Sequence, residues 1–247
     1  MNFSLNYILV FTIIVVMMSC GNNQSREQKM LDTTSQVVPI KDVELALFDG
    51  ITFKGWHAYN KPVENLSNWT IIDSALVCLG AADDAHGGDI VTDVEYGNFE
   101  LSWEWKVNKG SNSGVMYHVV EDSVYKAPYE TGPEYQIIDD VGFPGKLEDW
   151  QKAGADYAMY PANNKKKLMP VGEWNSSKII YNDGHVEHWL NGEKIVEFDR
   201  NSEDWKTKRT TGKWKDFPGY ATATKGKIAL QDHGSKSYFR NIVITEL

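Results

Sequence analysis

Short stretches of alternating apolar and polar residues recur along the chain after Pro39. A period of two is typical of a β-strand with one face in a hydrophobic core. The alternation is clearest at residues 99–107 (FELSWEWKV), where every second side chain is aliphatic or aromatic. The pattern predicts further strands at residues 69–72, 75–79, 114–120, 134–138, 178–182, 185–190, 193–198, 227–233 and 238–244.

Turn-forming pairs separate many of these segments, among them Asp73-Ser74, Asp183-Gly184 and Asn191-Gly192. Asp-Gly and Asn-Gly tolerate positive φ, so the last two pairs predict tight hairpins. Helical periodicity is scarce, and residues 147–152 predict only a short helical turn. Regularly spaced short strands indicate an all-β sandwich or barrel. No Pro/Gly/Ser-rich or charge-rich break interrupts the chain after Pro39, which favours a single domain over residues 41–247.

Three predicted strands place polar, chemically active side chains opposite their apolar face. Residues 99–107 carry Glu104, residues 134–138 carry Glu134 and Gln136, and residues 227–233 carry Gln231 and His233. A sheet backed by aliphatic side chains on one face and carrying these groups on the other predicts a shared polar cleft resting on the core. We expect the function to lie there.

The charge of the chain argues against nucleic acid as a partner. The formal net charge is -9 at pH 7, and the basic run Lys165-Lys166-Lys167 is typical of a solvated loop. Nucleic-acid binding requires a basic surface that neutralises phosphates. The nine Trp and twelve Tyr fit both a packed sandwich core and platforms that stack on sugars.

The N-terminal segment predicts export and a lipid anchor. Residues 7–18 form an apolar run of signal-peptide length, followed by Ser19-Cys20-Gly21, which resembles a bacterial lipobox. We therefore expect a lipoprotein signal peptide at 1–19, lipidation of Cys20, and a flexible tether at 20–40. The expected location is the periplasmic side or the outer membrane. Cys78 lies in an apolar segment and is expected to be buried and structural.

A series of motifs then stands in order along the chain: FDGITFKGW (48–56), GGDIVT (87–92), YGNFELSWEWKV (96–107), GSNSGVMY (110–117), TGPEYQIIDD (131–140), VGEWN (171–175), VEHWLNG (186–192), and IALQDHG with FRNI (228–242). Together they resemble the 3-keto-disaccharide hydrolase family over essentially all of residues 41–247. The resemblance implies a concanavalin-A-like jelly-roll β-sandwich of two antiparallel sheets. It also implies a carbohydrate substrate whose C3 hydroxyl has been oxidised to a ketone by a separate sugar 3-dehydrogenase.

The ketone determines which chemistry such a site needs. It acidifies the C2 proton, so the bond from C1 to the glycosidic oxygen can break by elimination, after which water adds. The site requires a base near C2, a hydrogen-bond donor or cation at the C3 oxygen, and an acid for the leaving group. The glycine-rich stretches of the chain lack the spacing of a dinucleotide fingerprint, so we expect no redox step here.

His233, Glu134 and Glu104 are the catalytic candidates. His233 follows a core-backed strand, and imidazole titrates near neutral pH, which suits a base or a metal ligand; the alternative is a histidine that caps a turn. Glu134 and Glu104 suit acid–base or metal-binding roles; the alternative is an ion pair with Lys106 or another base. Glu134 and His233 could together hold a divalent metal, the one cofactor that the composition suggests.

Further candidates would bind the substrate. The amides that could form hydrogen bonds with a sugar are Gln136, Gln231 and Asn112. Arg240 could hold a carboxylate or enolate, or instead pair with Asp232. Trp56 could stack on a sugar, although a core position is the commoner one for Trp in a sandwich. His188 shares its face with aliphatic side chains and is expected in the core.

Two other classes of function stay open at this point. A non-catalytic carbohydrate-binding lipoprotein is one, because the same fold serves lectins. A retaining glycosidase acting on unoxidised sugars is the other, since Glu100 and Glu104 have the i, i+4 spacing of paired carboxylates on one strand. A mixture of Glu, His and amides on one face favours an enzyme over a lectin.

Overall fold

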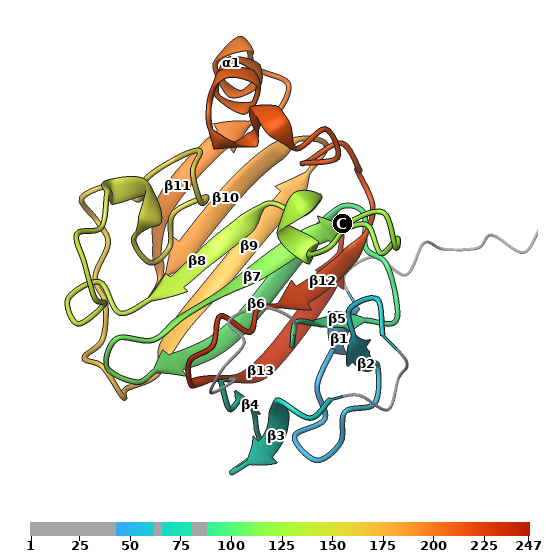
Figure 1. Ribbon diagram of the computed structural model, residues 1–247, viewed down its shortest axis with the longest axis vertical. Coiled ribbons are helices and arrows are strands. Elements are labelled where there is room, and N and C mark those ends of the chain that lie inside the picture. Colours follow the sequence, from blue (N-terminus) through green and yellow to red (C-terminus); the bar gives the residue numbers. More distant parts are fainter. Residues whose placement is uncertain (1–42, 62–65, 81–87) are drawn as a thin grey trace, which may run out of the picture. The chain divides into compact units, whose positions relative to one another are not determined.

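The computed structural model describes residues 43–61, 66–80 and 88–247, which belong to a unit spanning residues 40–247. The expected signal peptide, Cys20 and the tether lie outside the described residues. Two antiparallel sheets pack against each other as the two layers of a sandwich (Figure 1). No helix in the described ranges is long and apolar enough to cross a membrane.

The larger sheet has eight strands. Their order is β11 (Glu193–Asp199), β10 (His185–Leu190), β9 (Asn175–Asn182), β6 (Phe99–Val107), β13 (Ser237–Glu246), β4 (Ala75–Cys78) and β3 (Trp69–Ile72), with β1 (Glu44–Ala46) also paired to β13. The smaller sheet has five strands, in the order β2 (Trp56–Ala58), β5 (Ile90–Thr92), β12 (Lys227–Leu230), β7 (Asn112–Val119) and β8 (Glu134–Ile138). Both sheets therefore mix strands from distant parts of the sequence.

The core lies between the sheets and is rich in aromatic side chains. The alternation in β6 is realised as predicted, with its apolar residues buried and its polar residues partly exposed. The Trp103 ring of β6 meets the Tyr135 ring of β8 edge to face, with 5.0 Å between ring centres. Phe99 meets Tyr117 of β7 in the same way at 6.0 Å. Such contacts lock the two layers together, and the predicted all-β jelly-roll sandwich is confirmed.

Three predicted turns form tight hairpins with positive φ at both central residues. Asp183 and Gly184 have φ of 48° and 95° between β9 and β10, and Asn191 and Gly192 have 49° and 85° between β10 and β11. Asp73 and Ser74, between β3 and β4, have φ of 50° and 56°. These turns fix the register of the larger sheet, because a two-residue connection leaves no freedom for the strands to slide.

One helix was not predicted. Helix α1 (Glu203–Thr211) begins after Ser202, whose hydroxyl oxygen accepts the N–H of Trp205 at 3.2 Å. Acidic residues fill its first turn and basic residues its last, as the helix dipole favours. The short 3₁₀ segments are η1 (Pro128–Glu130), η2 (Asp149–Gln151) and η3 (Lys213–Asp216). Segment η2 confirms the helical turn expected at 147–152.

Strand β12 is shorter than predicted. It ends at Leu230, so Gln231 and His233 follow the strand instead of lying within it. The pairing continues beyond the strand end, since the Gln231 N–H donates to the Gly114 carbonyl at 3.0 Å. The Ser113 hydroxyl also donates to the Gln231 carbonyl at 2.7 Å. These two bonds hold the Gln231–His233 segment against β7.

Candidate functional site

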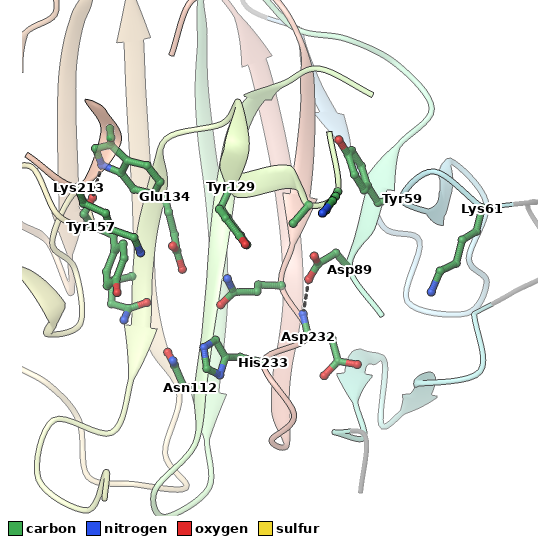
Figure 2. A pocket seen from close by; sticks show the side chains of 15 residues that line it. Tyr59, Lys61, Asp89, Asn112, Tyr129, Glu134, Tyr157, Lys213, Asp232 and His233 are labelled. Atoms are coloured by element: carbon green, nitrogen blue, oxygen red, sulfur yellow. Dashed lines mark hydrogen bonds between the residues drawn. The ribbon is translucent and has the colours of Figure 1, made fainter. Parts of the chain in front are cut away.

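A cavity of about 260 Å³ opens on the face of the five-stranded sheet that points away from the other sheet. Five residues predicted from the sequence line it: Asn112, Glu134, Gln136, Gln231 and His233. They come from β7, β8 and the segment after β12, which are neighbours in the sheet. Figure 2 shows Glu134 and Asp89 on opposite sides of Tyr129, with Asn112 and His233 below them in this view.

Glu134 is a buried carboxyl of the cavity, with 4% of its surface exposed. It precedes Tyr135 on β8, and since Tyr135 points into the core, Glu134 points into the cavity. Burial raises the pKa of Glu134 to about 8; the Lys213 ammonium opposes this rise, and the carboxyls of Asp89 and Asp156 add to it. At neutral pH Glu134 is therefore mainly a neutral carboxylic acid, able to donate a proton.

Three amides form the polar floor of the cavity. The Gln136 side-chain N–H donates to the Gln151 carbonyl at 3.1 Å, which fixes the direction of its oxygen. The side-chain oxygens of Asn112, Gln136 and Gln231 are buried, and no partner for them occurs among the described residues. Buried acceptors require donors. A ligand rich in hydroxyl groups, such as a sugar, would supply them.

Asp89 and Asp232 are site residues that the sequence did not single out. Asp89 directly precedes β5, and its Oδ1 accepts the Asp232 N–H at 2.8 Å. Burial raises the pKa of Asp89 to about 7, while the Asp232 N–H lowers it, the Asp232 carboxylate raises it and Lys61 lowers it. The Asp232 carboxylate accepts the Gly234 N–H at 3.0 Å and the Asn68 amide at 2.9 Å, so it braces the turn that carries His233.

Aromatic side chains wall the cavity. Tyr59 and Tyr129 line it together with Tyr157 and Trp214. The Trp214 indole N–H donates to the Tyr157 carbonyl at 3.2 Å. The Lys213 ammonium lies 4.2 Å from the centre of the Tyr157 ring. Aromatic faces pack against the C–H faces of sugar rings, and a cation held at the wall can meet a developing negative charge.

Glu104 and Arg240 are not part of the cavity, and the prediction that they belong to its face is wrong. Both lie on the eight-stranded sheet, on β6 and β13, where Arg240 Nε meets Glu104 Oε2 at 2.6 Å. The alternative partner proposed for Arg240, Asp232, is also wrong. The reason is topological: alternation reveals that β6 has a polar face but not which sheet the strand joins.

Trp56 is not a sugar platform either. Its side chain is 2% exposed, and its indole N–H donates to the Leu47 carbonyl at 2.6 Å, so it is a core residue. His188 is fully buried as predicted, with Nδ1 3.1 Å from the Gly154 carbonyl, and burial lowers its pKa to about 4. The thiol of Cys78 is buried as well, which confirms its structural position, and burial raises its pKa.

A metal site is not assigned to the cavity. Within the described ranges, three ligand-type atoms come within 4.8 Å of one another at His185, Glu187 and Glu197. This group lies on β10 and β11 of the larger sheet, and Glu134 and His233 are not in it. Lys194 already ion-pairs with Glu187 at 3.0 Å and with Glu197 at 2.8 Å, so its ammonium takes the position that a metal ion would need.

Two antiparallel sheets with a carboxyl-bearing, amide-floored cavity on the outer face of the smaller sheet define a carbohydrate-active jelly roll. Comparison with known proteins makes the assignment specific. Residues 45–245 match the family model of the 3-keto-alpha-glucoside-1,2-lyase-like domain. A 3-keto-disaccharide hydrolase of Bacteroides thetaiotaomicron is 34% identical over 250 residues, covering 90% of this chain and 85% of that protein. The chain therefore belongs to the 3-keto-disaccharide hydrolase family, and the resemblance drawn from its motifs is confirmed.

Solved structures agree with this assignment. A protein of Parabacteroides distasonis described as a putative glycosyl hydrolase is 48% identical, with a TM-score of 0.77 over 83% of this chain and 94% of that one. A second from the same organism is 30% identical, with a TM-score of 0.62 over 83% of this chain and 100% of that one. A galectin-like protein of Bacillus subtilis, 14% identical with a TM-score of 0.50, shares the fold alone. The family makes this chain an enzyme of the glycosidase type, a hydrolase or lyase.

Proposed function

We propose that this enzyme cleaves the glycosidic bond of 3-keto-glycosides, 3-keto-disaccharides among them, by abstraction of the C2 proton, elimination and hydration. The observation that carries the proposal is the buried carboxyl of Glu134, whose pKa burial raises to about 8, in a cavity whose floor presents three amide oxygens without a partner among the described residues. An elimination needs a proton donor for its leaving group, and a polyhydroxylated ring needs acceptors for its hydroxyls.

The other requirements are also met by residues of the cavity. Negative charge develops on the C3 oxygen as the C2 proton leaves, and Lys213 and His233 both line the cavity and carry N–H groups that can stabilise it. The walls from Tyr129 and Tyr157 exclude water from the enclosed ring, which strengthens these interactions. The cavity is small, so it suits a single sugar ring with its aglycone directed outward.

The structure gives no support to a retaining glycosidase built on Glu100 and Glu104. Glu100 pairs with Lys178 at 3.2 Å and Glu104 with Arg240 at 2.6 Å, both on the eight-stranded sheet and outside the cavity. Two carboxylates engaged with cations on a separate surface cannot flank a glycosidic bond in the cavity.

The chemistry of the reaction and the N-terminal sequence support proposals for the source of the substrate and for the location of the enzyme. A sugar ketone must be formed by oxidation of a hydroxyl, so a separate sugar 3-dehydrogenase would supply the substrate. The Ser19-Cys20-Gly21 motif supports lipidation of Cys20 and a membrane-anchored enzyme facing the periplasm or held at the outer membrane. Labelling with a radioactive fatty acid, lost on Cys20→Ala, checks the anchor.

The function is tested by incubating the purified protein with a 3-keto-disaccharide and with its unoxidised parent, and following release of the 3-keto monosaccharide. We expect turnover of the oxidised sugar alone, reduced at least about 100-fold by Glu134→Gln. Glu193→Gln, at an exposed position on β11, is the matched control and should keep full activity. Cleavage of the parent sugar would indicate an ordinary glycosidase, and binding without turnover a lectin.

A further inference from the structure

The buried carboxyl of Glu134 and the half-buried carboxyl of Asp89 face each other across the cavity. Asp89 directly precedes β5 and Glu134 lies on β8, with β12 and β7 between these strands. Three strand spacings of about 4.8 Å separate their backbones by roughly 14 Å. Both side chains line the cavity from its opposite sides (Figure 2). The space between them is therefore where a sugar ring would lie, with one carboxyl on each side.

The surroundings of the two carboxyls differ in a way that separates their roles. Asp89 Oδ1 accepts the N–H of Asp232, and Lys61 also lines the cavity; a hydrogen bond and a nearby cation both favour the ionised form. Glu134 packs against Gly114 and is almost completely buried, which favours the neutral form. The pKa of Asp89 is raised to about 7 and that of Glu134 to about 8, which agrees with the order expected from their surroundings. Asp89 thus loses its proton first.

We propose that Asp89 is a second catalytic residue, which removes the C2 proton of the 3-keto sugar while Glu134 protonates the leaving glycosidic oxygen from the opposite wall. This inference rests on the proposed function. The electrons of the C2–H bond first pass into the C3 carbonyl as an enolate, and they then form a double bond between C1 and C2 as the bond from C1 to oxygen breaks. Asp89 ends protonated and Glu134 ionised.

Hydration restores both groups. Glu134 takes a proton from water as the water oxygen bonds to C1, and Asp89 returns its proton to C2. The released sugar then carries a C1 hydroxyl and keeps its C3 ketone, and neither an oxidant nor a reductant is consumed. The two carboxyls exchange acid and base roles between the steps, as microscopic reversibility requires.

Substrates with different leaving groups test the division of roles. A nitrophenolate leaves without protonation, whereas a sugar alkoxide does not. On a 3-keto-disaccharide, we expect Asp89→Asn and Glu134→Gln each to lower kcat/KM by about 10²- to 10⁴-fold. On a nitrophenyl 3-keto-glucoside, the kcat/KM of Glu134→Gln should lie within about tenfold of that of the unaltered enzyme, whereas the kcat/KM of Asp89→Asn should stay low.

Asp73→Asn is the matched control, because Asp73 is exposed in the β3–β4 turn, is not among the residues that line the cavity, and Asn tolerates its positive φ of 50°. Circular dichroism and thermal unfolding establish that each variant folds. Recovery of Asp89→Asn but not Glu134→Gln on the nitrophenyl substrate would overturn the proposal, as would full activity of Asp89→Asn on the disaccharide. If the unaltered protein cleaves neither 3-keto substrate, the proposed function fails instead.

Discussion

Gly114 on β7 leaves room for the Glu134 carboxyl because it has no Cβ atom. A Cβ atom added at Gly114 would lie 2.2 Å from Glu134 Oε1 and 2.8 Å from both Cγ and Cδ of the same side chain. The two strands are direct neighbours, with Gly114 opposite Gln136 and Met116 opposite Glu134. The glycine is therefore needed for the close approach of a carboxyl rather than for an unusual backbone angle.

Gly114→Ala should displace the Glu134 side chain and leave the fold intact. The atoms in the way belong to the end of one flexible side chain, which can rotate at little cost to the sheet. We expect kcat/KM to fall at least about tenfold, because catalytic groups must keep their geometry within a fraction of an ångström. Gly97→Ala is the control, since its nearest neighbour is the Thr224 carbonyl at 3.9 Å. Normal kinetics of Gly114→Ala would argue against a catalytic Glu134.

The pH dependence of kcat/KM should be bell-shaped, with its maximum between about pH 7 and 8. The active form has Asp89 ionised, so activity rises through its pKa of about 7; it has Glu134 protonated, so activity falls through its pKa of about 8. The charged groups that act on Asp89 are Asp232 and Lys61, and those that act on Glu134 are Lys213, Asp89 and Asp156.

Substitutions of two lysines check the alkaline limb of this profile. Lys213→Met should move the alkaline limb to higher pH, because Lys213 lowers the pKa of Glu134. Lys215→Met, exposed on the same 3₁₀ segment, should leave the limb in place. A flat profile from pH 6 to 9 would contradict the acid–base pair.

Glu134→Gln should stabilise the protein at alkaline pH. Folding raises the pKa of Glu134 from its usual 4.5 to about 8, so its contribution to stability is complete below pH 4.5 and is lost as the pH rises through 8. The free energy of unfolding of Glu134→Gln relative to the unaltered protein should therefore increase between pH 5 and 9, by on the order of 1–4 kcal/mol. Urea unfolding at both pH values measures the difference. Glu193→Gln, exposed on β11, should show no such trend.

Much of the fold could be predicted because its strands are long enough to alternate. β6, β8 and β10 have the predicted bounds, and the hairpins at Asp183-Gly184 and Asn191-Gly192 form as expected. The three-residue strands β1, β2 and β5 were missed, since three residues give no measurable period. Helix α1 carried a usable signal, because Ser202 is followed by Glu203 and Asp204. The helix was missed because its residues are almost all polar and show no apolar periodicity.

The site was predictable only in part, for a different reason. Glu134, Gln136, Gln231, His233 and Asn112 lie on or beside strands whose polar face is clear from alternation. Strand order is a non-local property, and it decides that β5 joins β12 and β7 in the sheet that carries the cavity. Asp89 sits just before β5 in the motif GGDIVT and could have been found only by knowing that order.

Glu104→Gln and Arg240→Met should leave catalysis almost unchanged. The pair lies on the eight-stranded sheet, outside the residues that line the cavity, and each side chain is about one-third exposed. An ion pair of this kind contributes at most about 1 kcal/mol to stability, and the guanidinium also packs 3.9 Å from the Trp174 ring centre. We therefore expect kcat/KM within about threefold of the unaltered enzyme and a small fall in the unfolding midpoint. Glu134→Gln, assayed beside them on the 3-keto-disaccharide, should lose most activity. If Glu104→Gln were instead the inactive variant, the catalytic site would lie on the eight-stranded sheet.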